Sequence, residues 1–149
     1  MLTKTSETAV RVLVLIAREA GERPVSPGQI AEQLGASPSY LAKISTLLVK
    51  ADILKTFRGM YGGMKLSHPP EEISLLAIVE ACQGKILGDY CQEHPKLKQV
   101  CAYHVAMHEL QCAIVETLEK WTLAALAAKP APDLALRDVV SCRMSRAAP

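Results

Sequence analysis

Thiol and imidazole side chains are concentrated in the second half of this 149-residue chain. All five cysteines and three of the four histidines lie within residues 69–149. Cys101 and His104 are three positions apart, so they share one face if their segment is helical. A position near the start of a helix favours the thiolate form that binds metals. Cys91 lies upstream and could close onto this pair, and a mixed set of thiolates and imidazole suits a 2Fe–2S centre.

The same region allows other interpretations. His104, His108 and Cys112 follow one another at intervals of four residues and could instead bind zinc from one helix face. A free cysteine is also a small apolar side chain that packs well in a core. We interpret Cys82 and Cys112 in this way, and we assign no role to Cys142 in the C-terminal tail. The odd number of cysteines does not indicate a disulfide framework.

Charge is distributed unevenly along the chain. Residues 1–68 carry nine Lys and Arg against five Asp and Glu, whereas residues 69–149 carry eight against ten. A basic first half suits a polyanionic partner such as nucleic acid. Half of the residues are apolar, but the apolar run at 12–17 is too short for a membrane span or a secretory signal. We therefore expect a soluble, cytoplasmic protein with no membrane partner.

Apolar spacing and helix caps predict a mainly α-helical fold. A helix over about residues 5–20 has an apolar face at positions 9, 12, 13, 16 and 17. Ser26 and Ser37 each precede a proline and predict the starts of two short helices, which end at Gly35 and near Ala51. Two helices joined by so short a turn form a helix-turn-helix.

The segments after the helix-turn-helix predict a wing and a long helix. Alternating residues around a glycine-rich turn at 59–63 predict a two-stranded β hairpin, the wing of a winged helix. A helix over 75–81, capped by Ser74, completes a DNA-binding domain over residues 1–81. We expect a cysteine-bearing sensor loop at 82–96, a dimerisation helix at 97–128 and a loose tail at 129–149.

The predicted helix over 97–128 carries a long apolar stripe. Its members are spaced by three or four residues: Val100, Tyr103, Met107, Leu110, Ile114, Leu118 and Trp121. Such a stripe must be covered, most simply by the same helix of a second chain. The alternative is that the helix folds back on its own domain.

A helix-turn-helix places the first turns of its second helix in the major groove of DNA. Hydroxyl and cationic side chains there can contact base edges and phosphates, and basic residues on a wing can reach the adjacent backbone or minor groove. The candidate DNA-binding residues are Ser37, Ser39, Tyr40, Lys43, Arg58, Tyr61 and Lys65. Ser37 also serves as a helix cap, and Tyr40 could simply pack.

The wing sequence at residues 58–66, Arg-Gly-Met-Tyr-Gly-Gly-Met-Lys-Leu, resembles the IscR/NsrR family of bacterial winged-helix regulators. The residues at 39–41, 73–81 and 121–123 also fit, so the similarity covers about residues 1–128. The resemblance implies a homodimer that binds a near-palindromic, double-stranded operator. It places Ser37, Ser39, Tyr40 and Arg58 at positions that the family uses for DNA, whereas Ala42 stands where some members have an acidic base-discriminating residue.

Cluster-binding members of this family hold a 2Fe–2S or 4Fe–4S cluster with three cysteines, commonly spaced Cys-x5-Cys-x5-Cys. The fourth ligand is a histidine three residues after the last cysteine, or an acidic residue from the partner's first helix. The resemblance therefore implies Cys101, His104 and Glu7 as ligands, and Cys91, the upstream cysteine, could complete the set. The spacing departs from the family pattern, since nine residues separate Cys91 from Cys101 and no cysteine lies between them.

The sequence thus predicts a dimeric transcriptional regulator whose iron–sulfur cluster controls its affinity for DNA. We expect a 2Fe–2S cluster in preference to a 4Fe–4S cluster, and a repressor in preference to an activator. One alternative is a cluster-free regulator in which Cys91 or Cys101 acts as a thiol switch. Another is a module that binds a protein partner instead of DNA. We do not expect an enzyme, because no phosphate-binding loop or complete catalytic triad can be placed.

Overall fold

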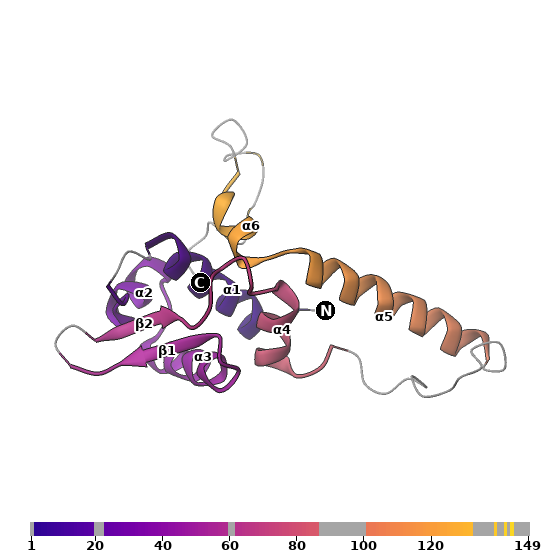
Figure 1. Cartoon of the computed structure of the whole chain (residues 1–149), viewed down its shortest axis with the longest axis horizontal. Helices are drawn as coiled ribbons and strands as arrows, with labels where there is room; N and C mark the ends of the chain where they lie inside the picture. Colours follow the sequence, from indigo (N-terminus) through magenta and orange to yellow (C-terminus); the bar gives the residue numbers. More distant parts are fainter. Residues whose placement is uncertain are drawn as a thin grey trace.

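The computed structural model describes residues 2–19, 23–59, 62–86 and 101–132, together with Val139, Cys142 and Met144. Most helices and the hairpin form one body, and helix α5 extends from it as an arm (Figure 1). The predicted site residues Tyr61 and Cys91 lie outside the described residues, as do most of the sensor loop and tail.

Helix α1 (Lys4–Glu19) lies at the centre of the core. Ala9, Leu13 and Ile16 are completely buried on its apolar face, and the helix contacts α2, α3, α4, α6 and the second strand of the hairpin. The spacing of apolar residues predicted both this helix and its buried face, and both predictions are confirmed.

Helices α2 (Pro27–Leu34) and α3 (Pro38–Lys50) form the predicted helix-turn-helix. Ser26 and Gln29 form a reciprocal capping box, with hydrogen bonds of 3.1 and 3.2 Å. Gly35 ends α2 at φ 62°, in the left-handed region that favours glycine. The Ser37 hydroxyl caps α3 by accepting from the backbone N–H of Tyr40. The turn between the two helices therefore follows from local sequence signals.

Strands β1 (Leu54–Phe57) and β2 (Gly63–Leu66) pair antiparallel, with Leu54 opposite Leu66 and Phe57 opposite Gly63. The hairpin is attached to the chain before α2, because Val25 and Met64 exchange two backbone hydrogen bonds of 2.9 and 2.8 Å. A Cβ atom at Gly63 would lie 2.5 Å from the Val25 carbonyl oxygen. Glycine is therefore required at this close approach, and the predicted wing is confirmed.

Helix α4 (Leu75–Gln83) is two residues longer than predicted, so Cys82 lies in a helix and not in the sensor loop. Gln83 accounts for the extension, because its Oε1 accepts hydrogen bonds from the Ser6 hydroxyl at 2.7 Å and from the Thr3 N–H at 3.0 Å. These contacts hold the end of α4 against the start of α1.

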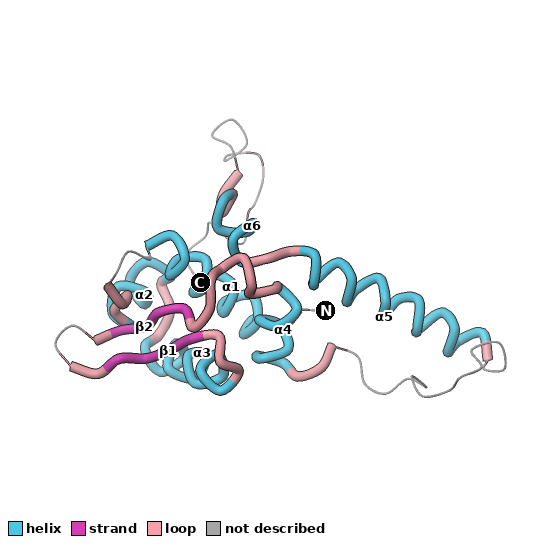
Figure 2. Tube along the Cα trace, in the orientation of Figure 1, coloured by secondary structure: helices cyan, strands magenta, loops and turns pink. Residues whose placement is uncertain are grey.

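The prediction of one helix over residues 97–128 is wrong. The described residues form two helices, α5 (Ala102–Lys120) and α6 (Leu123–Ala128), separated by an extended backbone at Trp121 and Thr122. Figure 2 shows this break as a loop at the base of the arm. The Thr122 hydroxyl caps α6 by accepting from the N–H of Ala125 at 3.3 Å, so α6 begins with its own N-cap.

Tertiary hydrogen bonds explain the break. The N–H of Leu75 donates to the carbonyl of Trp121 at 2.7 Å, and the N–H of Leu123 donates to the carbonyl of Ile73 at 2.8 Å. The Leu123 side chain is completely buried. The chain leaves the helical path here because pairing with the segment before α4 buries Leu123. Within the described ranges, no helix is both long and apolar enough to span a membrane.

Candidate functional site

The N-terminal turns of α3 carry four of the predicted DNA-binding residues. Ser37, Ser39 and Lys43 are exposed, and the two serine hydroxyls lie 3.4 Å apart. Tyr40 is half-buried and packs against the core, and its hydroxyl donates to Thr5 Oγ1 at 3.4 Å. Tyr40 therefore holds α3 against α1, as its packing interpretation predicts, whereas the other three side chains face solvent.

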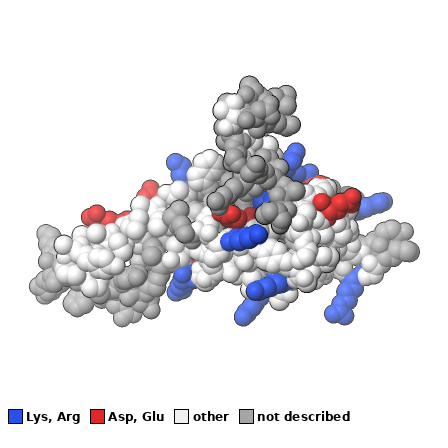
Figure 3. Space-filling view, turned by 180° about the vertical axis from the view of Figure 1, so that it is seen from behind, with Lys and Arg blue, Asp and Glu red and all other residues white. Residues whose placement is uncertain are grey.

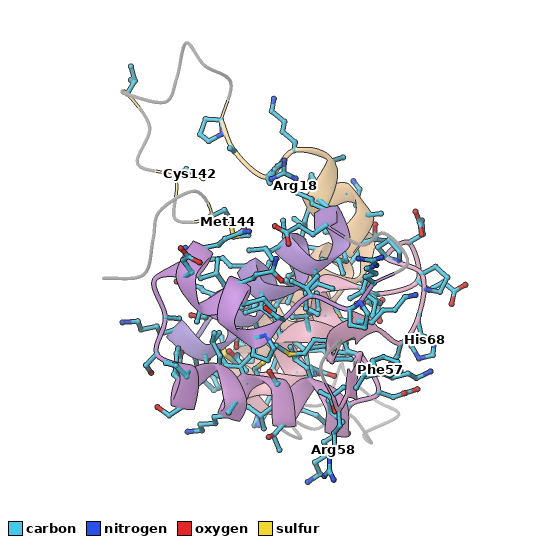
Figure 4. All side chains as sticks on the ribbon, turned by 90° about the vertical axis from the view of Figure 1, so that its left-hand side faces the viewer. Arg18, Phe57, Arg58, His68, Cys142 and Met144 are labelled. Atoms are coloured by element: carbon cyan, nitrogen blue, oxygen red, sulfur yellow. The ribbon has the colours of Figure 1, made fainter. Side chains whose placement is uncertain are left out.

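The wing presents two further predicted residues. Arg58 and Lys65 are exposed, and Figure 4 shows Arg58 pointing away from the body at the end of β1. Lys65 lies opposite Lys55 across the hairpin, so two like charges share this part of the wing. Such a pairing is unfavourable in isolation but is favourable beside a polyanion.

A groove of about 810 Å³ separates α3 from the wing. Its walls include Ala42, Thr46 and Val49 of α3 and Phe57 of β1, and Phe57 is 48% exposed. Thr46, Val49 and Phe57 are not among the DNA-binding residues that the sequence predicts, and Ala42 is noted there only as a departure from the family pattern. The signal that could have identified them is the spacing of three or four residues that continues from Ser39 along the helix.

Positive charge surrounds this groove. Lys43 and Lys50 of α3 and Arg58 of the wing are all exposed. In Figure 3, several Lys and Arg side chains project from the edge of the body on which α3 lies in Figure 1. This edge therefore combines a projecting helix, a hairpin and cationic side chains, the features that a winged helix uses on duplex DNA.

Cys101 and His104 come together at the start of α5, as predicted. Cys101 is the N-cap residue and makes no capping hydrogen bond with its side chain. Its Sγ lies 3.0 Å from Nδ1 of His104, and Cys101 is exposed while His104 is partly exposed. A thiol and an imidazole are thus adjacent and accessible at the outer end of the arm.

The predicted zinc site on α5 does not form. Cys112 Sγ lies 3.6 Å from His108 Nε2 as a second thiol–imidazole pair. However, no three His, Cys, Asp or Glu side chains within the described ranges are close enough to hold a metal ion together. Side chains at intervals of four drift around the helix axis because 3.6 residues make a turn. Glu7 lies on α1 and, in a single chain, joins no such group either.

The remaining described cysteines differ in exposure. Cys82 is half-buried and packs against the core, and burial raises the pKa of its thiol. Its packing interpretation is therefore confirmed. Cys112 is exposed, so the prediction that it packs is wrong for the single chain as far as the structure describes it.

The apolar stripe on α5 is open to solvent in a single chain. Tyr103 is 62% exposed, Leu110 48% and Trp121 47%. Two further members of the stripe, Ile114 and Leu118, are half-buried and line an apolar pocket of about 330 Å³ with Leu2, Ile86, Ala113 and Thr117. Within the described residues, a fold-back of this helix does not cover Tyr103 or Leu110, so the outer part of the stripe is left open.

Comparison with known proteins gives a consistent answer. Residues 2–129 match the Rrf2 family model, described as an iron-dependent transcriptional regulator. The chain is 31% identical to the regulator IscR of Sodalis glossinidius over 127 residues, which are 84% of this chain and 77% of that protein. It is 29% identical to the regulator NsrR of Halalkalibacterium halodurans over 126 residues, 82% of this chain and 86% of that protein.

The fold agrees with the sequence relationship. It is similar to the structure of CymR, the global cysteine regulator of B. subtilis, with a TM-score of 0.71 and 25% identity over 86% of this chain and 96% of that one. The relatives IscR and NsrR are named as helix-turn-helix transcriptional regulators, a class of proteins that are not enzymes. The helix-turn-helix, the wing and the family match over residues 2–129 lead to one conclusion: the chain belongs to the Rrf2 family of transcriptional regulators.

Proposed function

We propose that this regulator binds operator DNA as a homodimer and that a thiol-ligated iron–sulfur cluster at the start of α5 controls its affinity. The observation that carries the proposal is the convergence of Cys101 Sγ and His104 Nδ1, 3.0 Å apart, at an accessible helix start. The DNA-contacting surface consists of exposed residues of α3 and the wing: Ser37, Ser39, Lys43, Arg58 and Lys65, with Tyr40 in support. Tyr61, which the sequence predicts to contact DNA, lies outside the described residues and is included on the sequence alone.

The homodimer is supported by the arm. Apolar side chains at half exposure along α5 are costly in water, and covering them with the same face of a second chain removes that cost. Two recognition helices related by a two-fold axis then meet half-sites about one helical turn, ~10 bp, apart.

The donor set fits an iron–sulfur cluster. Cys101 and His104 supply one thiolate and one imidazole from the same face of α5, a combination that the 2Fe–2S centres of Rieske proteins use. Cys91 of the preceding segment and Glu7 of the partner subunit complete the proposed set. When bound, the cluster would supply a centre whose redox state or integrity changes with the cell's oxidant and iron supply.

The residues of this chain would convert that change into a change in DNA affinity. Glu7 lies on α1, which packs against α3. If α5 of one protomer and α1 of the other share the ligands, the cluster would fix the position of α1, and of the α3 helix packed against it, relative to the partner subunit. Gain or loss of the cluster then shifts the population between arrangements that do and do not match the operator spacing.

Optical and chemical assays test the cluster. Protein purified without oxygen is expected to absorb broadly in the visible region and to contain iron and sulfide in stoichiometric amounts. Cys101→Ser and His104→Ala should lower the iron content, whereas Cys82→Ser should not, because Cys82 packs against the core. A colourless protein that also resists reconstitution with iron and sulfide would contradict the proposal.

A cluster-free thiol switch is the second candidate, and the exposure of Cys101 next to an imidazole favours it. Hydrogen peroxide would oxidise the Cys101 thiol to a sulfenic acid and be reduced to water. Mass spectrometry after peroxide treatment, combined with a DNA titration, tests it. Unmodified cysteines with unchanged DNA binding would eliminate this candidate.

A further inference from the structure

The side of α3 that faces away from the core carries small side chains. The core side is formed by Leu41, Ile44 and Leu48, which are buried. Helical geometry places residues 39, 42, 46 and 50 on the opposite side, and all four are exposed. Ala42 and Thr46 occupy the middle of this side, with Ser39 and Lys50 at its ends. The residues that would lie deepest in a major groove are thus an alanine and a threonine.

Thr46 offers a methyl group to a partner. Its hydroxyl donates a hydrogen bond of 2.9 Å to the carbonyl of Ala42 within the helix. The hydroxyl hydrogen is therefore already used, and Thr46 presents its methyl group and a residual acceptor. Ala42 presents its Cβ alone. Val49, which is 39% exposed, continues this methyl-bearing surface into the groove beside the wing.

The composition of α3 restricts which bases it can read. In the major groove, adenine is read by Asn or Gln, cytosine by Asp or Glu and guanine by Arg or Lys, whereas thymine presents a methyl group to apolar side chains. Helix α3 contains no Asn, Gln, Asp, Glu or Arg, and its cations are Lys43 and Lys50. At the centre of the exposed side of α3, Ala42 and Thr46 can therefore recognise a base only through contact between methyl groups.

We propose that Ala42 and Thr46 determine operator specificity by contacting thymine methyl groups in each half-site. Duplex DNA is the occupant because this apolar strip is accompanied by the exposed cations Lys43 and Lys50 on the same helix and Arg58 on the wing, which can contact phosphates. The inference rests on the DNA-binding function proposed above and adds the chemical feature that is read.

Deoxyuridine replacement tests this directly, because it removes only the thymine methyl group. The full-length protein, kept without oxygen, first selects its site from a pool of randomised double-stranded DNA. Each thymine of the selected site is then replaced singly. We expect a few positions in each half-site at which affinity falls about fourfold, the value of one buried methyl group, and no effect elsewhere.

Substitutions assign the effect to its residues. Thr46→Ser removes the methyl group of the side chain and keeps the hydroxyl, so it should weaken binding to the site that contains thymine. On DNA in which the contacted thymine is replaced by deoxyuridine, the variant and the wild type should bind with the same affinity. Thr46→Val keeps a methyl group at that place and should retain the discrimination. Thr117→Ser is the matched control, because Thr117 makes the same bond to a helix carbonyl on α5, at 2.7 Å. Sedimentation must first show that this variant is still a dimer, since Thr117 lines the pocket beside Ile114 and Leu118.

The outcomes separate the two proposals. A selected site whose deoxyuridine replacements all bind as tightly as thymine overturns methyl readout while DNA binding stands. A methyl effect that persists unchanged in both Thr46→Ser and Ala42→Gly also overturns the assignment to these residues. If no sequence is enriched and no salt-dependent binding occurs, the DNA-binding function fails and this inference fails with it.

Discussion

The N–H of Leu75 donates a hydrogen bond to the carbonyl of Trp121 at 2.7 Å, which joins the first residue of α4 to the residue at which α5 ends. The neighbouring residues Ser74 and Thr122 form an isolated antiparallel bridge. The arm is therefore attached to the DNA-binding body by backbone hydrogen bonds as well as by packing. Helix α4 in turn packs against both α1 and α3, so contacts connect α5 to the helix-turn-helix through α4.

Leu123 anchors this junction. It is completely buried where α6 meets the core. We expect Leu123→Ala to lower the free energy of unfolding by about 2–5 kcal/mol, since it removes buried methyl groups and leaves a cavity. Chemical denaturation at a fixed protein concentration measures the change. Val139→Ala, at a side chain that is 78% exposed, is the control and should alter stability by less than about 0.5 kcal/mol.

A charge on the apolar stripe should separate the protomers. Leu110 is 48% exposed in the single chain, and Leu110→Glu would bury a carboxylate at the proposed dimer interface. We expect a monomer in sedimentation experiments, with weaker operator binding. Glu116→Lys changes a charge on the opposite side of α5 and should leave the dimer intact. A dimer that survives Leu110→Glu would show that another surface mediates dimerisation.

Cationic residues on the two parts of the DNA surface should differ in their effects. Arg58→Ala should weaken operator binding by roughly 1–3 kcal/mol if the guanidinium makes a specific contact. Lys43→Ala should reduce the slope of log affinity against log salt by about one, because it removes one phosphate contact. Fluorescence anisotropy titrations at several salt concentrations measure both. Lys120→Ala, at the end of α5, should change neither quantity.

Thiol reactivity should follow burial. Because burial raises the pKa of Cys82, less of its thiolate is present at any given pH than for a thiol in water. At about pH 8, near the ordinary thiol pKa, iodoacetamide should therefore alkylate the exposed Cys101 and Cys112 before Cys82. Peptide mass spectrometry over time gives the order. Equal rates in the folded protein would contradict the packing of Cys82, and urea should remove the difference.

Asp52 should contribute a small pH dependence to stability. A hydrogen bond from His68, with Nε2 2.9 Å from Oδ2, holds the pKa of this exposed carboxyl below its usual range. The contribution is therefore fully present above the ordinary carboxyl pKa and is lost as pH falls through the lowered one. Thermal unfolding between neutral and acid pH should show a smaller decline for Asp52→Asn than for the wild type. Glu72→Gln, at another exposed carboxylate, is the control.

Local signals were sufficient for the DNA-binding body. The hydroxyls of Ser26 and Ser37 cap their helices by accepting hydrogen bonds from backbone N–H groups only three residues further along the chain. Gly35 stands where a positive φ favours glycine. Such interactions lie within a few residues or follow a short period, so the sequence alone determined the helix-turn-helix, the wing and the buried face of α1.

The arm and its surroundings depended on tertiary structure. The apolar spacing continues through Trp121, which predicts one helix. The helix is instead divided in two, because Leu75 donates a hydrogen bond to Trp121, Leu123 donates one to Ile73, and the Leu123 side chain is buried. The pairing of Cys101 with His104 followed from a spacing of three, whereas the accessibility of Cys112 did not follow from any local pattern. Sequence period describes which side chains share a face, but only the packing of distant segments decides which face is covered.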